Sequence, residues 1–113
     1  MTSKRQPHRR SLSLAKLDEM IEEATVDAYG DSEQIVGFLT ILEERLKLPF
    51  KTEVLRVEVI VERLDITDDE QIVAVCSRGK SQQPVAILDL TLPDPPPEGA
   101  EWIEAFRRWA RGN

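Results

Sequence analysis

The hydrophobic pattern of this chain changes its period twice, and this change constrains the fold more than any other feature of the sequence. Up to about residue 48, apolar residues recur every three or four positions, as on one face of an α-helix. From Thr52 they alternate with charged residues, as in a strand with one buried face. Beyond residue 98 the helical spacing returns. This order predicts an α+β fold.

Two helical patterns lie on either side of Gly30. The first begins near Ser11 or Ser13, either of which can cap a helix, and its expected apolar stripe is Leu14, Leu17, Ile21, Ala24 and Ala28. The second begins at Asp31 or Ser32, with Asp31 and Gln34 spaced as a capping box. Its expected stripe is Ile35, Phe38, Leu39, Leu42 and Leu46, and Pro49 ends it. The short link predicts an antiparallel helical hairpin over residues 12–48.

Residues 51–92 are expected to form a small antiparallel β unit. One long half-buried strand is predicted over residues 55–62, with a bend or break allowed midway. An acidic turn at 65–70, a strand at 71–77, a turn that contains Gly79 and a strand at 84–90 follow. Turns this short require antiparallel neighbours.

A proline-rich connector leads to a final helix over residues 98–111. Trp102, Phe106 and Trp109 fall on one side of this helix, and we expect that aromatic stripe to dock on the sheet, with a ligand cage as the alternative. The length of 113 residues fits a single domain, here residues 12–111. Residues 1–11 are polar and basic and are expected to be a disordered arm, either a tether or a solubilising tail.

Charge is distributed unevenly along the chain. The formal net charge of the whole chain is −6. Residues 1–17 carry five basic residues and no acid, so the remaining residues have a net charge of −11. Such a body would repel nucleic acid and suits cations or basic protein partners. We expect no membrane span, because no apolar stretch is long enough to cross a bilayer. The single Cys76 lies in an apolar run, which predicts a buried thiol and a reducing, cytoplasmic location.

The residue types that enzymes most often use are scarce. The only histidine, His8, lies in the basic arm, and the five glycines are too scattered to form a phosphate-binding loop. We therefore expect a protein that is not an enzyme. A hydrolase with two paired carboxylates is the weakest alternative, because no pair stands out.

Two clusters of carboxylates are the remaining candidates for chemistry. The first brackets Gly30, and the second surrounds the expected β-turn; their members are Asp27, Asp31 and Glu33, and Glu62, Asp65, Asp68, Asp69 and Glu70. Ca²⁺ takes about six to eight oxygen ligands from carboxylates, carbonyls and water. Neither cluster fits the EF-hand pattern: counted from Asp27, Ser32 takes the glycine position. Composition alone explains both clusters as solvated turns.

One motif adds to this interpretation. The run Val26-Asp27-Ala28-Tyr29-Gly30, followed by Glu33-Gln34, resembles the signature of the cyanobacterial-type, CcbP-like calcium-binding protein family, as does Leu42-Glu43-Glu44 leading to Pro49-Phe50. The resemblance covers residues 20–111. It implies a helical hairpin, a small SH3-like antiparallel barrel over residues 51–92 and a closing helix that carries tryptophan, here Trp102 and Trp109.

The resemblance also implies a function. It indicates a non-enzymatic Ca²⁺-binding protein, a buffer or a sensor, with Asp27 as the best-matched ligand, then Glu33, then Asp31. The turn with Asp65, Asp68, Asp69 and Glu70 is the second expected site. Two alternatives stay open. The acidic face could bind a basic protein partner without metal, or the matched run could be structural, with Tyr29 packed in the core and Asp27 a buried acceptor.

Overall fold

A computed structural model describes residues 12–112, so the predicted basic arm, residues 1–11, lies outside the described residues. The elements in chain order are α1 (Leu14–Ala24), α2 (Asp31–Arg45), β1 (Phe50–Val54), β2 (Val57–Ile66), β3 (Ile72–Arg78), β4 (Ser81–Ala86) and α3 (Glu101–Ala110). The predicted α+β fold, with helices before and after an antiparallel sheet, is confirmed.

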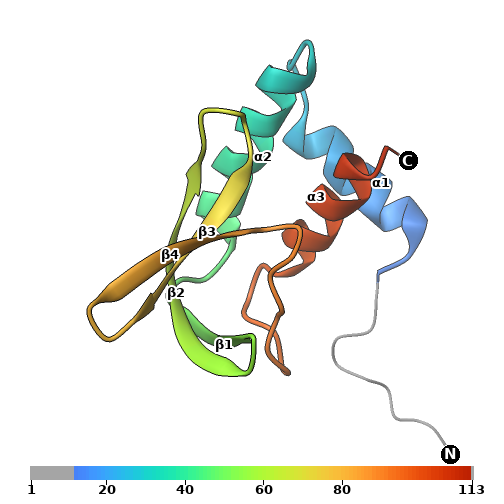
Figure 1. Cartoon of the computed structure of the whole chain (residues 1–113). Helices are drawn as coiled ribbons and strands as arrows, with labels where there is room; N and C mark the ends of the chain where they lie inside the picture. The colour runs from blue at the N-terminus through green and yellow to red at the C-terminus, as the bar shows by residue number, and fades with distance from the viewer. Residues whose placement is uncertain (1–11, 113) are drawn as a thin grey trace, which may run out of the picture.

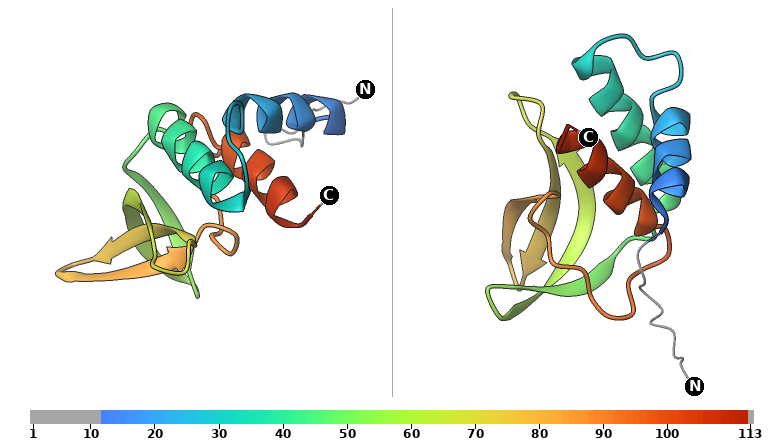
Figure 2. Two further views of the ribbon diagram at one scale, coloured as in Figure 1. Left: turned by 90° about the horizontal axis from the view of Figure 1, so that it is seen from above. Right: turned by 90° about the vertical axis from the view of Figure 1, so that its right-hand side faces the viewer.

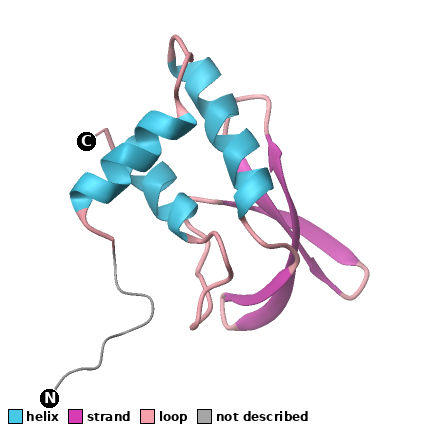
Figure 3. Ribbon diagram, turned by 180° about the vertical axis from the view of Figure 1, so that it is seen from behind, coloured by secondary structure: helices cyan, strands magenta, loops and turns pink. Residues whose placement is uncertain are grey.

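The molecule has two layers. The four strands form one antiparallel sheet in the order β1-β2-β3-β4, so β1 and β4 are its edges. The three helices lie together on one side of this sheet (Figures 1 and 2). Seen from behind, the tips of two β-hairpins, β1–β2 and β3–β4, extend away from the helical layer (Figure 3). The SH3-like barrel that the resemblance implies stays a prediction.

Helix α1 begins where its cap predicts and ends earlier than expected. The hydroxyl of Ser13 accepts a hydrogen bond from the Lys16 N–H at 3.1 Å, as an N-cap does. The helix ends at Ala24 with Thr25 as its C-cap: the Thr25 N–H still makes the helical bond to the Ile21 carbonyl, and the Thr25 hydroxyl donates to the same oxygen at 2.7 Å. The expected stripe was wrong at its first residue, since Leu14 is 61% exposed and Met20 is buried instead.

Helix α2 packs against both other helices and against β2. Its buried residues include Phe38 and Leu42, as predicted, and both are fully buried. The predicted Asp31–Gln34 capping box is absent from this described helix: the N-cap is Gly30, at φ 92°, and it makes no side-chain cap. Instead, Glu33 reaches back to accept a hydrogen bond from the Tyr29 N–H at 2.7 Å.

The long strand expected over residues 55–62, with a bend or break allowed midway, is interrupted at its start, so that two strands, β1 and β2, replace it. Leu55 (φ 54°) and Arg56 (φ 67°) form a two-residue turn, so that Val54 pairs with Val57. Two successive positive φ values are typical of a type I′ hairpin turn, whose usual residues are Asn and Gly. The sequence gives no turn signal here, and the alternation of residues continues straight through the turn.

The last strand begins earlier than expected. Gly79, at φ 59°, and Lys80 form another two-residue turn, with Arg78 opposite Ser81. The strand therefore covers Ser81–Ala86 rather than residues 84–90. Pro84, which has no N–H to donate, is tolerated in it because β4 is an edge strand.

The final helix docks mainly on its fellow helices. Between ring centroids, Phe106 lies 5.3 Å and Trp109 lies 5.4 Å from Phe38 of α2. The indole N–H of Trp109 donates to the Gln34 side chain at 2.9 Å. The expectation that this aromatic stripe docks on the sheet is thus corrected, because α2 lies between them.

Two glycines permit close backbone approaches within this layer. A Cβ on Gly37 would lie 2.3 Å from the Ala24 carbonyl oxygen, at the end of α1. A Cβ on Gly99, which has φ 89°, would lie 1.9 Å from the Arg45 carbonyl oxygen, at the end of α2. The middle of α2 and its C-terminal end therefore each pack closely against the backbone of a neighbouring segment. Within residues 12–112, every helix is too short or too polar to cross a bilayer.

The Leu55–Arg56 turn gives a stability prediction. Replacing the pair by Asn-Gly removes two strained left-handed residues and should stabilise the fold by about 1–2 kcal/mol, or several degrees in Tm. Thermal unfolding followed by circular dichroism measures the change. The matched replacement Leu14→Asn, of another exposed leucine, should give no such gain. An unchanged or lower Tm for the turn variant would contradict the type I′ geometry.

Candidate metal centre

The loop between α1 and α2 presents the first acidic cluster. Asp27 has φ 62°, a conformation that Asp tolerates better than most residues, and the chain turns again at Gly30. Asp27, Asp31 and Glu33 are all exposed. Glu33 is held by the Tyr29 N–H, whereas in the described chain Asp27 and Asp31 accept no recorded hydrogen bond.

The turn between β2 and β3 presents the second cluster. The Thr67 N–H donates to the Gln71 carbonyl and the Glu70 N–H to the Thr67 carbonyl, each at 2.9 Å. The Thr67 hydroxyl donates to the Asp69 carboxylate. Asp65 accepts a hydrogen bond from the Ile66 N–H at 2.8 Å. Tertiary contacts and local hydrogen bonds thus fix a tight turn whose carboxylates Asp65, Asp68, Asp69 and Glu70 are exposed.

A side-chain hydrogen bond joins these two loops. The Ser32 hydroxyl, in the first turn of α2, donates to Glu70 Oε2 at 2.6 Å across 38 residues of sequence. Both loops lie at the same end of the molecule, at the top of Figure 1. The structure therefore brings together two clusters that the sequence showed only as separate.

The carboxylates do not yet converge on one point. Within residues 12–112, no group of three or more His, Cys, Asp or Glu side chains is placed so that it could hold a metal ion. Glu62, the outlying member of the second cluster, instead accepts a hydrogen bond from the Ser77 hydroxyl at 2.6 Å. A cation at this end would need exposed carboxylates to rotate toward it.

The matched run Val26–Gly30 is a surface feature. Val26 is 67% exposed and Tyr29 is 81% exposed, while Asp27 is also exposed. The alternative in which Tyr29 packs in the core and Asp27 is a buried acceptor is therefore wrong. Core packing does not explain why these residue types occur here.

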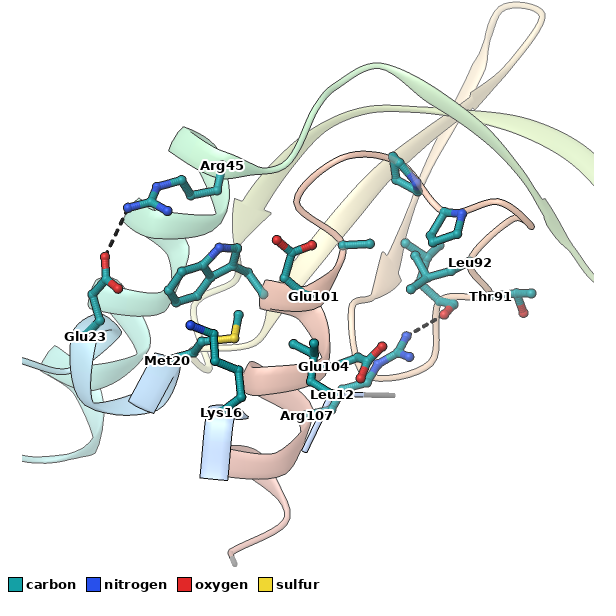
Figure 4. Close-up of a pocket in the computed structure, with 15 residues that line it drawn as sticks. Leu12, Lys16, Met20, Glu23, Arg45, Thr91, Leu92, Glu101, Glu104 and Arg107 are labelled. Atoms are coloured by element: carbon teal, nitrogen blue, oxygen red, sulfur yellow. Dashed lines mark hydrogen bonds and ion pairs between the residues drawn. The ribbon is translucent and has the colours of Figure 1, made fainter. Parts of the chain in front are cut away.

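A large cavity lies elsewhere, between α1, α3 and the segment after β4 (Figure 4). It measures about 670 Å³ and contains charged groups of both signs. Arg45 pairs with Glu23 at 3.0 Å and lies 5.3 Å from the centroid of the Trp102 ring. These contacts tie the ends of α1 and α2 to α3.

On the other wall of this cavity, Arg107 holds the chain after β4. Its guanidinium donates to the carbonyl oxygens of Ile87, at 2.9 and 3.2 Å, and of Leu90. Burial raises the pKa of the neighbouring Glu104, although Arg107 opposes this effect. The described residues of the lining include neither His nor Cys, and Arg45, Glu23 and Arg107 act there as structural ties.

Cys76 is buried, as predicted. It is 1% exposed, and burial raises the pKa of its thiol, which keeps it protonated and unreactive.

Comparison with known proteins gives one match. The CcbP family model, described as calcium binding, matches residues 18–110. No curated protein matches the chain, and no solved structure does.

The raised pKa of Glu104 predicts that replacing this carboxyl by a neutral group stabilises the fold at neutral pH but not at acidic pH. A carboxyl whose pKa is higher in the folded state favours folding while it is protonated, and this contribution is lost as the pH rises through that pKa. Glu104→Gln should therefore raise Tm slightly at pH 7, on the order of 1–2 °C, and the gain should vanish below about pH 4. Thermal unfolding across this range, with Glu43→Gln as the exposed control, measures it. A gain that persists at low pH would point to a cause other than ionisation.

Proposed function

Since the chain belongs to the CcbP family of calcium-binding proteins, we propose that it binds Ca²⁺ at the end where the α1–α2 loop meets the β2–β3 turn. The ligands that we propose are Asp27, Asp31 and Glu33 from the first loop and Asp65, Asp68, Asp69 and Glu70 from the second. Asp27 and Glu33 are the first choice, and the β2–β3 turn is the second site.

The observation that carries this proposal is the Ser32–Glu70 hydrogen bond. It holds the two acidic segments against each other, so that a cation there can draw oxygens from both. The seven carboxylates are exposed, and turns leave backbone carbonyls available as further ligands. A flexible set of oxygens of this kind suits Ca²⁺ better than Mg²⁺, which requires a stricter octahedron.

Binding would change this end of the protein in a defined way. Seven like charges close together repel one another, and a divalent cation neutralises part of that charge. Because the carboxylates must rotate to converge, binding would order the two loops and stabilise the folded state. Such ordering supports a role as a Ca²⁺ sensor or buffer, without an EF-hand and without catalysis.

Calorimetric titration of the chelator-stripped protein tests the proposal. Ca²⁺ should bind and raise Tm more than equal Mg²⁺, and Asp27→Asn should weaken Ca²⁺ binding about tenfold. Asn tolerates the left-handed backbone at this position as Asp does, so a loss reports the missing charge. Glu43→Gln, on the exposed side of α2, removes the same kind of charge outside both loops and should have no effect.

Two results would count against this site. Equal Tm values in Ca²⁺ and in EDTA would show that the protein does not bind Ca²⁺. Normal binding by Asp27→Asn, Glu33→Gln and Asp69→Asn alike would place the metal elsewhere in the chain.

One observation favours a second function at the same end. Tyr29 and Val26 are exposed among carboxylates, a combination that suits a basic protein segment with an apolar residue. In that case Tyr29→Ser should weaken capture of a Lys/Arg-rich peptide about tenfold and leave Ca²⁺ binding unchanged, as measured by fluorescence anisotropy and calorimetry. Equal capture of the peptide by the Tyr29→Ser variant would contradict this second function.

A further inference from the structure

We infer that the groove between the tips of the two β-hairpins, opposite the acidic loops, is a docking site for a segment of a partner protein that combines apolar and acidic side chains. We call this the tip groove. It measures about 590 Å³ and is lined by Val54, Leu55, Val57, Val59, Cys76, Arg78, Gly79, Ser81, Gln82 and Gln83. Its volume lies within the range of roughly 300–1,000 Å³ that is usual for binding pockets.

The floor of the tip groove continues the core-facing side of the sheet. Val59 and Cys76 are buried, and Val54 and Val57, nearer the tip, are half-buried. Strand register places these residues on the face that carries Val61 in the core. In Figure 1 both hairpins reach past the helices that cover this face. The apolar face of the sheet is therefore longer than its helical cover.

Leu55 lies at the rim of this groove, where both its backbone conformation and the exposure of its side chain are unfavourable. It is 92% exposed, and it occupies a left-handed position that is unfavourable for residues other than glycine. Neither its backbone nor its side chain gains from this placement in the free protein. A strained residue that presents a large apolar group to solvent beside a groove is a typical feature of a contact site.

Charge selects the kind of partner. The chain has 21 acidic and 15 basic residues, yet none of the ten described residues that line the tip groove is acidic, and one is Arg78. Arg56 and Lys80 lie in the two turns beside it. Glu53 and Glu58 pair across β1 and β2 but, by the alternation of the strands, point to the other face of the sheet.

These features fit an acidic apolar segment better than other partners. The three cations are too few to hold nucleic acid, which the acidic body would repel. They suffice to orient carboxylates that flank an apolar side chain, while Leu55 and the valines contact that side chain. The side-chain amide of Gln83, which register places on the same face as Cys76, can bond the partner's backbone.

A peptide selection tests this inference on the full chain. We would select phage-displayed random peptides of about 12 residues on the immobilised protein, then measure the labelled consensus peptide by fluorescence anisotropy. The expected consensus has an apolar residue flanked by Asp or Glu. Binding should fall at least about tenfold in Arg78→Glu, and also in the Leu55→Asn/Arg56→Gly double variant. Because that double variant should be more stable than the natural protein, its loss of binding would not come from unfolding.

Matched controls separate the groove from general surface effects. Arg63→Glu reverses a charge on the other face of the sheet, and Leu14→Asn removes an exposed leucine at the start of α1; both should bind normally. Failure to enrich any peptide, a consensus without acids, or equal binding by Arg78→Glu would overturn the inference. Self-association in sedimentation that disappears in the Leu55 variant would assign the groove to a second copy of the chain and would overturn it as well.

Discussion

The burial of Phe38 holds this small fold together. Its side chain is fully buried and touches the rings of Phe106 and Trp109, 5.3 and 5.4 Å away between centroids. Edge-to-face and tilted contacts of this kind add to the hydrophobic gain of burial. Gly37, next to it, lets the end of α1 approach the backbone of α2. One turn of α2 thus fixes the positions of both other helices, and the sheet packs on the layer that results.

This helical layer sets the geometry of both proposed surfaces. At one end, α2 begins at the α1–α2 loop, and Ser32 in its first turn reaches Glu70 in the β2–β3 turn. At the other end the helices stop short of the hairpin tips, which leaves the groove uncovered. The proposed metal site in the loops and the proposed docking site on the sheet face lie at opposite ends and do not overlap.

The helices and the general fold class were predictable, because they depend on local periodicity and caps such as Ser13. The break at Leu55–Arg56 was not, because neither residue favours a turn and the pairing of β1 with β2 imposes the positive φ values. The residues of the candidate site could be named from the sequence. Their meeting depended on the Ser32–Glu70 contact, which joins segments 38 residues apart and leaves no local signal. The exposure of Tyr29 could not be predicted either, since an aromatic beside a helix end is as often buried.

The two ends of the molecule differ in electrical sign. Seven carboxylates gather in the loops at one end, while Arg56, Arg78 and Lys80 lie near the hairpin tips at the other, so opposite charges are concentrated in these two regions of the described chain. A cationic surface would adsorb such a molecule by its acidic loops and leave the hairpins facing the solution. Immobilised on an amine-coated support, the protein would form an oriented layer, and loading its loops with a divalent ion would loosen that attachment.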